Sequence, residues 1–407
     1  MKFNWTALIL SILVALPSLS LAGSGGYEST VLGVPAGADS VVGVRLNNLG
    51  HVAGWSQYFG QAEPSLKGWT WTPEDGFTVL PPPPGFYQGR SRAMDINDNG
   101  GVAGDGGYDI GLAWRYESGV YTVTGGVEGM PGAYLGGINN AGDLAGTAKD
   151  DTITTPDFAF LDESGGSLSC LTPGGGRATD LNDNGQVCGI VNPLSGPFEA
   201  FRWDTAGGIQ TLGTLGLAFS HANRMNDGGD VVGVATSGSG NTNRAWIYTD
   251  AGGMQALPAP YLNASSAIAI NNHGHVVGIS ERSGPDLNWL WTGGESVTDI
   301  AALFDTVAAN VNVLSVRDIN DAGQILVQVF DNNVPGLRML VLTPPGNAVA
   351  GDINGDGLLN MNDVGPFASA SIGTPMSPEH MERADVNGDG ATNASDIQTF
   401  IDAMMSP

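Results

Sequence analysis

The sequence predicts a mainly β protein: a seven-bladed β-propeller closed by an N-terminal strand, followed by a small α-helical domain that binds calcium. Three observations lead to this prediction. A short phrase with Asn at its first position and Gly at its fourth occurs seven times. Short β-prone runs surround each copy, and no helical periodicity appears between residues 27 and 342. Two oxygen-rich loops of a different kind follow near the C-terminus.

The repeated phrase is predicted to be a tight turn between two antiparallel strands. Its copies start at Asn47, Asn97, Asn139, Asn182, Asn226, Asn271 and Asn320. The Asn side chain can hydrogen-bond the backbone that follows, and the Gly supplies the positive φ that other residues resist. A direct role of these residues in binding calcium or a ligand is the alternative.

Each copy carries enough apolar runs for one blade. The run after the turn, such as 51–54, is followed by a third run such as 69–71, a Gly-containing turn and a fourth run such as 77–80. Four antiparallel strands in about 45 residues match the length of a propeller blade, and such units bury their apolar faces only by stacking.

The last repeat is one strand short. It stops after its third run at Leu342, whereas residues 27–32 read as a lone strand at the other end of the chain. We therefore expect the N-terminal strand to complete the seventh blade and leave no exposed sheet edge.

The repeat resembles the bacterial extracellular repeats named for their His-Ala-Phe triplet. The matching text is residues 265–278, with the signature at 212–216 between two copies. This resemblance implies a β-propeller outside the cell, in a family that has no agreed ligand or reaction.

The domain boundaries follow from these patterns. Residues 1–22 look like a signal peptide, with Lys2, an apolar core and a small-residue cleavage site. We expect the propeller at 23–342, a linker at 343–350 and the second domain at 351–407. The signal predicts a secreted protein at the cell exterior, and no later run reaches the roughly 20 apolar residues of a membrane span.

Charge and cysteine content limit the function further. The formal net charge is −26, which argues against nucleic acid and anionic membranes as partners. Cys170 and Cys188 lie in adjacent predicted blades. A disulfide between them and two buried thiols are both open at this stage.

The tail carries two calcium-loop motifs. Oxygen side chains at loop positions 1, 3, 5, 9 and 12, the carbonyl at position 7 and Gly at position 6 suit one calcium ion per loop. The predicted ligands of the two ions are Asp352, Asn354, Asp356, Leu358, Asn360 and Asp363, and Asp385, Asn387, Asp389, Ala391, Asn393 and Asp396.

Asp at position 12, with a helix after each loop and no full helix before it, resembles a type I dockerin over residues 351–405. This resemblance implies folding around calcium and a cohesin-like partner, often one that joins polysaccharide-degrading enzymes to a scaffold. The expected apolar core is Met361, Val364, Phe367, Ile397, Phe400, Ile401 and Met404.

One face of the propeller is expected to carry the longer, variable loops, where function commonly lies. Its candidate residues for contact with a polysaccharide or a surface protein are Tyr58, Phe59, Tyr87, Tyr108, Asp150, Asp151, Asp157, Phe219, Tyr261, Glu281 and Asp286. Ordinary loop chemistry is the alternative explanation of these residues.

The innermost strands carry the candidate catalytic groups. Two residues before the repeat Asn stand Arg45, Asp95, Gly137, Asp180, Arg224, Ala269 and Asp318. Asp95, Asp180 and Asp318 are candidates for a carboxylate cluster of the kind that glycoside hydrolysis needs. The alternative is inter-blade ion pairing, Arg45 with Asp95 or Asp318 and Asp180 with Arg224.

The favoured function is a secreted, non-catalytic binding or adhesion protein with a calcium-dependent docking or anchoring tail. The alternative is a polysaccharide hydrolase or lyase tethered through that tail. A third hypothesis makes the tail a calcium-dependent cap or anchor without a cohesin. Pairing of all three aspartates with arginine would remove the best candidates for catalysis.

Overall fold

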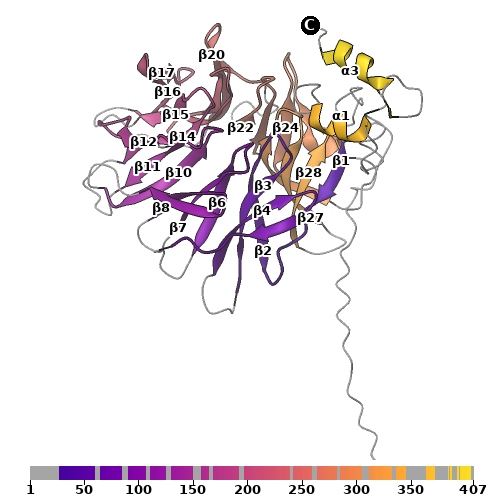
Figure 1. The fold of residues 1–407 in the computed structure, drawn as a ribbon. Helices are drawn as coiled ribbons and strands as arrows, with labels where there is room; N and C mark the ends of the chain where they lie inside the picture. The colour runs from indigo at the N-terminus through magenta and orange to yellow at the C-terminus, as the bar shows by residue number, and fades with distance from the viewer. Residues whose placement is uncertain are drawn as a thin grey trace, which may run out of the picture.

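The fold is seven four-stranded antiparallel sheets followed by two short helices in a computed structural model (Figure 1). The structure describes residues 27–59, 65–84, 90–106, 111–124, 130–149, 157–164, 168–191, 197–238, 242–258, 264–281, 285–304, 311–331, 336–344, 364–371, 384, 386, 392–393 and 395–404. The expected signal peptide lies outside these residues.

Each of the first six blades is built from four consecutive strands. Blade 1 has β2 (Ser40–Leu46), β3 (Val52–Gln57), β4 (Leu66–Thr72) and β5 (Gly76–Val79); blade 2 has β6 (Ser91–Ile96), β7 (Val102–Gly106), β8 (Leu112–Glu117) and β9 (Val120–Thr124); blade 3 has β10 (Gly132–Ile138), β11 (Leu144–Lys149), β12 (Phe158–Asp162) and β13 (Leu168–Cys170). Blade 4 has β14 (Gly176–Leu181), β15 (Val187–Val191), β16 (Glu199–Asp204) and β17 (Gly208–Gly213); blade 5 has β18 (Phe219–Met225), β19 (Val231–Thr236), β20 (Asn243–Thr249) and β21 (Gly253–Ala256); blade 6 has β22 (Ser265–Ile270), β23 (Val276–Ser280), β24 (Leu287–Trp291) and β25 (Thr298–Asp299).

The seventh blade confirms the predicted closure. It contains β26 (Val311–Ile319), β27 (Ile325–Asp331) and β28 (Leu337–Thr343), and its outer strand is β1 (Glu28–Val31) from the N-terminus. The register pairs Glu28 with Thr343 and Val31 with Leu340, so the two ends of the repeat region lie side by side (Figure 1).

A large aromatic side chain on the third strand of most blades packs over a glycine on the second. Trp69 is fully buried and pairs with Gly54. A Cβ at Gly54 would lie 2.5 Å from the Trp69 ring and 2.1 Å from the Val42 carbonyl oxygen, so only glycine fits. The seventh blade replaces this pair with Val327 and Leu340, dividing the volume between two aliphatic residues.

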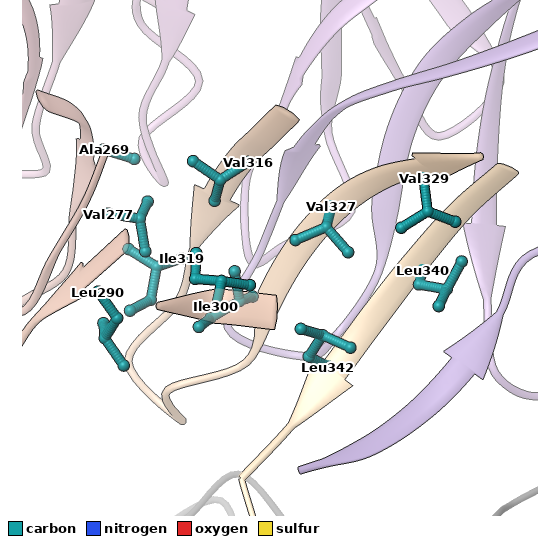
Figure 2. Close-up of a cluster of buried hydrophobic side chains, with 11 residues drawn as sticks. Ala269, Val277, Leu290, Ile300, Val316, Ile319, Val327, Val329, Leu340 and Leu342 are labelled. Atoms are coloured by element: carbon teal, nitrogen blue, oxygen red, sulfur yellow. The ribbon is translucent and has the colours of Figure 1, made fainter. Parts of the chain in front are cut away.

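The apolar core lies between neighbouring blades. Figure 2 shows the cluster in which Val277 and Leu290 of blade 6 meet Ile319 and Val327 of blade 7. Because each blade covers its neighbour, the ring must close before every apolar face is buried. Cys170 and Cys188, on the third and fourth blades, do not form a disulfide.

The described tail consists of α1 (Val364–Ser371) and α3 (Asp396–Met404). Phe367 and Phe400 stack with their ring centres 4.0 Å apart, against Ala370 and Ala384. None of the helices in the described ranges has the length and apolar character needed to cross a membrane.

Three of the residues expected in the tail core are exposed instead: Val364, Ile397 and Ile401. The buried stripe of α3 carries Asp396 and Phe400, four residues apart. Ile397 and Ile401 follow these residues by one position each, which rotates them about 100° around the helix and out of the core.

Candidate functional site

A closed ring of amide hydrogen bonds joins the seven tight turns. Each repeat Asn donates its Nδ2–H to the backbone carbonyl of the repeat Asn in the next blade, from Asn47 to Asn97 and finally from Asn320 back to Asn47, at 2.9 to 3.2 Å. The Oδ1 of the same side chain accepts the backbone N–H four residues on in its own turn. One buried side chain therefore shapes the turn and fastens two blades together.

A second ring lies beside the first. The residues after the repeat Asn are Asn48, Asp98, Asn140, Asp183, Asp227, Asn272 and Asp321, and each donates its backbone N–H to the side-chain oxygen of the next, at 2.7 to 3.0 Å. The turn face of the disc is thus held together by repeated polar contacts around the whole ring.

Breaking one link of the amide ring is expected to destabilise the propeller. Asn271→Ala removes an acceptor for His273 and His275 and the donor to the Asn320 carbonyl, all in a buried site. The expected loss is roughly 1–3 kcal/mol of unfolding free energy, because buried polar groups lose their partners. Chemical denaturation measures it, with the exposed Asn184→Ala as control; equal losses in both variants would contradict the role of the buried ring.

Arg45 crosses the central channel and contacts all three candidate carboxylates. Its Nε lies 3.1 Å from Asp95, its Nη2 2.8 Å from Asp180 and its Nη1 3.9 Å from Asp318. All four side chains are buried. The expected Arg45 pairs with Asp95 and Asp318 are present. The expected pair of Asp180 with Arg224 is wrong, because Arg45 is long enough to reach Asp180 from blade 1.

Each of these aspartates also ties its blade to the next one. Asp95 accepts the Ile138 N–H, Asp180 accepts the Met225 N–H and Asp318 accepts the Leu46 N–H, at 2.9 to 3.0 Å. Each carboxylate therefore pairs with Arg45 and also accepts a backbone hydrogen bond. Buried charges are stable only when they are paired in this way.

Gly137 leaves room for this cluster in blade 3. A Cβ at this position would lie 3.0 Å from an oxygen of Asp95 and 3.0 Å from an oxygen of Asp180. Those contacts are tight for any larger side chain. Because Gly137 has no side chain, the space beside Asp95 and Asp180 stays open for the Arg45 guanidinium.

Burial dominates the ionisation of the cluster. Burial raises the pKa of Asp180 to about 7 although Arg45 lowers it, and burial also raises the pKa values of Asp95 and Asp318. Burial works against the charge of Arg45, but the three carboxylates outweigh it and raise the pKa of the guanidinium. Arg45 is therefore the permanent charge in the cluster, and Asp180 is the member that titrates near neutral pH.

Two cavities open along the channel on opposite sides of the cluster. The cavity on the turn face, about 160 Å³, is walled by the two polar rings and reaches the Arg45 cluster. The cavity toward the loop face is larger, about 680 Å³, which lies in the range of small-molecule sites. We call it the loop-side funnel.

A β-bulge in every innermost strand forms the wall of the loop-side funnel. The register skips one residue at Val44, Met94, Gly136, Thr179, Asn223, Ile268 and Arg317, and all of these except Arg317 line the funnel. A bulge re-aims side chains, so two successive positions of each strand face the channel. The bulge residues differ from blade to blade, unlike the turn residues.

Sequence reasoning missed these bulge residues. In a regular strand, successive side chains point to opposite faces. This rule predicts that the Arg45 position faces the channel and that the residue before it points away. Seven different residue types occupy the bulge, and no glycine or proline recurs there to mark it. No sequence signal distinguishes this position from an ordinary strand residue.

A smaller cavity of about 240 Å³ adjoins the funnel and shares His221 with it. Phe198, which is 40% exposed, and the ion pair of Arg177 with Asp157 at 2.7 Å line this outer cavity. Phe219 contacts Phe198 with a ring separation of 5.7 Å. Burial, followed by the charge of Arg177, lowers the pKa of His221.

The predicted loop-face residues differ in their exposure in the structure. Asp157 and Phe219 lie at the outer cavity, Phe59 is 65% exposed, and Glu281 and Asp286 are exposed. Tyr58 was wrongly expected on the surface, since it is 3% exposed and lies under Lys67, whose Nζ is 4.3 Å from the ring centre. The other candidates, Tyr87, Tyr108, Asp150, Asp151 and Tyr261, lie outside the described residues.

Most predicted calcium ligands also lie outside the described residues; Asn393 and Asp396 are within them. Asp396 is completely buried at the start of α3, and its Oδ2 accepts the Asn393 N–H at 2.9 Å. An acid in a first helical turn is favoured by the helix dipole. The Asn393 Oδ1 accepts the backbone N–H and the hydroxyl of Ser395. Both oxygen side chains are thus held at the start of α3, where the sequence predicts the end of the second calcium loop.

Comparison with known proteins identifies the tail. The description "Dockerin type I domain" matches residues 350–405. No curated protein matches the chain.

Solved structures resemble the propeller. The β-propeller domain of the Trilobed protease from Pyrococcus furiosus, described as having an open velcro topology, has 9% identity and a TM-score of 0.50, over 75% of this chain and 94% of that one. Virginiamycin B lyase from Staphylococcus aureus has 12% identity and a TM-score of 0.48, over 79% and 99%. TolB from Acinetobacter baumannii has 13% identity and a TM-score of 0.40, over 73% of this chain and 64% of its own length. At these identities the likeness concerns the fold alone.

Proposed function

We propose that this chain is an extracellular, non-catalytic binding protein in which the loop side of the propeller holds a ligand and the dockerin tail attaches the protein to a partner. The observation that carries the proposal is the difference between the two faces. On the turn face the same hydrogen bonds recur in every blade, whereas the loop-side funnel is walled by residues that vary between blades. Variable side chains around a concave site are typical of recognition.

The tail supplies the second half of the proposal. Dockerin type I domains bind cohesins and are typical of extracellular proteins, so a cohesin-like partner at residues 351–405 and two calcium ions are the expected attachments. Ile397 and Ile401, both 43% exposed, present adjacent apolar side chains on α3. Secretion through residues 1–22 and the resemblance to the His-Ala-Phe repeats belong to the same proposal.

The alternative, a polysaccharide hydrolase or lyase, draws no support from the inner carboxylates. Asp95, Asp180 and Asp318 all lie within 4.0 Å of Arg45 and accept backbone donors of the next blade. Groups used in this way are suited to holding blades together. A calcium-dependent cap without a cohesin remains the other role for the tail.

The full-length protein is expected to bind at least one member of an array of polysaccharides, oligosaccharides and surface-protein peptides. Val44→Trp, which places an indole ring in the wall of the loop-side funnel, is expected to weaken this binding strongly because the ring narrows the site. Asn184→Trp, on an exposed turn of the other face, is the control and should bind normally. Equal binding by the two variants would contradict the proposed site, and release of reducing ends from a bound polysaccharide would favour the enzyme.

A further inference from the structure

We infer that the loop-side funnel recognises an organic carboxylate, with Arg224 contacting the charged group and the apolar bulge residues contacting the body of the molecule. This inference rests on the proposed binding function and specifies the chemistry of the ligand. It depends on three features of the funnel: its cation, its apolar wall and the charges around it.

Arg224 is a cation with donors to spare. Its Nη1 donates to the carbonyls of Asn223, at 2.8 Å, and Thr179, at 3.3 Å. Its Nε is buried without a hydrogen-bond partner. In the part of the chain that the structure describes, no carboxylate oxygen lies within 4.0 Å of this guanidinium. In a chain with a net charge of −26, the Arg224 guanidinium thus lies outside the ion pairs of the described residues.

Asp180 does not neutralise Arg224, although both occupy the same position in adjacent blades. The Asp180 Oδ1 accepts from Arg45 at 2.8 Å, and its Oδ2 accepts the Met225 N–H at 3.0 Å. Both oxygens are therefore engaged elsewhere. A half-buried guanidinium favours a planar oxyanion that can accept from two of its N–H groups.

The remaining wall is suited to the rest of such a ligand. Val44, Met94 and Ile268 form an apolar side, while Thr236, Asn243 and Ser266 add hydroxyl and amide groups. Burial against the apolar side favours a ligand with a hydrophobic body. His221 joins the funnel to the outer cavity, so a longer molecule extends toward Phe198.

The described linings of the two cavities differ in charge, which favours entry of an anion from the loop side. The turn-face cavity is lined by seven aspartates, which are Asp98, Asp183, Asp227, Asp321 and the three inner ones, against two arginines, Arg45 and Arg224. Arg224 thus lies between the two cavities and lines both. Among the described residues, no Asp or Glu lines the funnel. An anion is repelled at the turn face and reaches Arg224 from the loop side.

The test compares 4-phenylbutyrate with 4-phenylbutyramide, which have the same body and differ in charge. Isothermal titration calorimetry of the full-length protein is expected to show the acid binding about tenfold more tightly than the amide. Arg224→Gln is expected to remove that preference. Arg115→Gln loses the same charge at a position that donates to the Gly142 carbonyl, outside the funnel, and should keep it. Thermal unfolding checks that both variants are folded.

The outcomes separate this inference from the proposed function. If the acid and the amide bind equally, and Val44→Trp weakens both, the funnel binds ligands without using Arg224 and the inference is overturned while the binding function stands. If Val44→Trp changes neither these titrations nor binding on the array, both are overturned. Equal behaviour of Arg224→Gln and Arg115→Gln also overturns the inference.

Discussion

Replacing Arg45 with methionine is expected to lower the unfolding free energy of the propeller by roughly 3–5 kcal/mol, the usual effect of leaving buried charges without their partner. The substitution keeps much of the side-chain volume but removes the one positive charge shared by Asp95, Asp180 and Asp318. Chemical denaturation followed by tryptophan fluorescence measures the loss. Arg115→Met is the matched control, because that guanidinium donates to a carbonyl and not to a buried carboxylate.

The loss in Arg45→Met is also expected to depend on pH. Burial raises the pKa of Asp180 from its ordinary 3.8 to about 7 in the folded protein, so folding favours the protonated form. Such a group contributes stability below its unfolded pKa, and that contribution disappears as pH rises through about 7. Without Arg45 the folded carboxyls are still harder to ionise, so the variant should be less impaired at pH 5 than at pH 8. A loss that is constant over this range would show that ionisation of the cluster is not its cause.

Removing calcium is expected to unfold residues 351–405 and leave the propeller folded. The buried apolar core of the described tail is small, with Phe367, Phe400 and two alanines at its centre. Domains of this size are marginally stable, and many are stabilised by a metal or by disulfides. The two loops contain six aspartates and no Lys or Arg, so their charges repel when no cation is bound. Calcium at a hundred times its dissociation constant would contribute about 2.7 kcal/mol for each site.

Hydrogen exchange of the full-length protein measures this effect. Peptides from α1 and α3 should exchange rapidly in excess EGTA and slowly in calcium, while peptides from β22 and β23 remain protected in both. Asp396→Asn should raise the calcium concentration needed for protection, and the exposed Asp286→Asn should not. Binding to a cohesin should follow the same calcium dependence. Slow exchange of α3 in EGTA would refute metal-dependent folding.

The ring architecture was predictable because it depends on a sequence pattern that repeats over short distances in the chain. The Asn at each turn makes its own local hydrogen bonds, and the Gly at the fourth position has a positive φ, for example 77° at Gly50 and 75° at Gly274. A hairpin every 42 to 50 residues then forces stacking. The missing fourth strand after Leu342 and the lone strand near Tyr27 made closure through β1 and β28 the expected solution.

The candidate site was predictable only in part, because its contacts join residues far apart in the chain. Arg45 and Asp180 are separated by 135 positions, and which carboxylates share Arg45 depends on the width of the channel. The exposure of Ile397 depends on which stripe of α3 meets Phe367. The bulge at Val44 adds a second channel-facing residue that strand alternation excludes.

The sequence by itself determined the number of blades, the turn chemistry, the closure and the dockerin tail, since each depends on spacing and on residues close together in the chain. Only the tertiary structure decided which charges are neutralised and which side chains meet in the channel. Arg45 takes all three carboxylates, and Arg224 is left facing a funnel of about 680 Å³. Ion pairing in a buried channel depends on how far each side chain extends and on which backbone N–H groups compete for the carboxylates. Both are defined only when the seven blades surround the same axis.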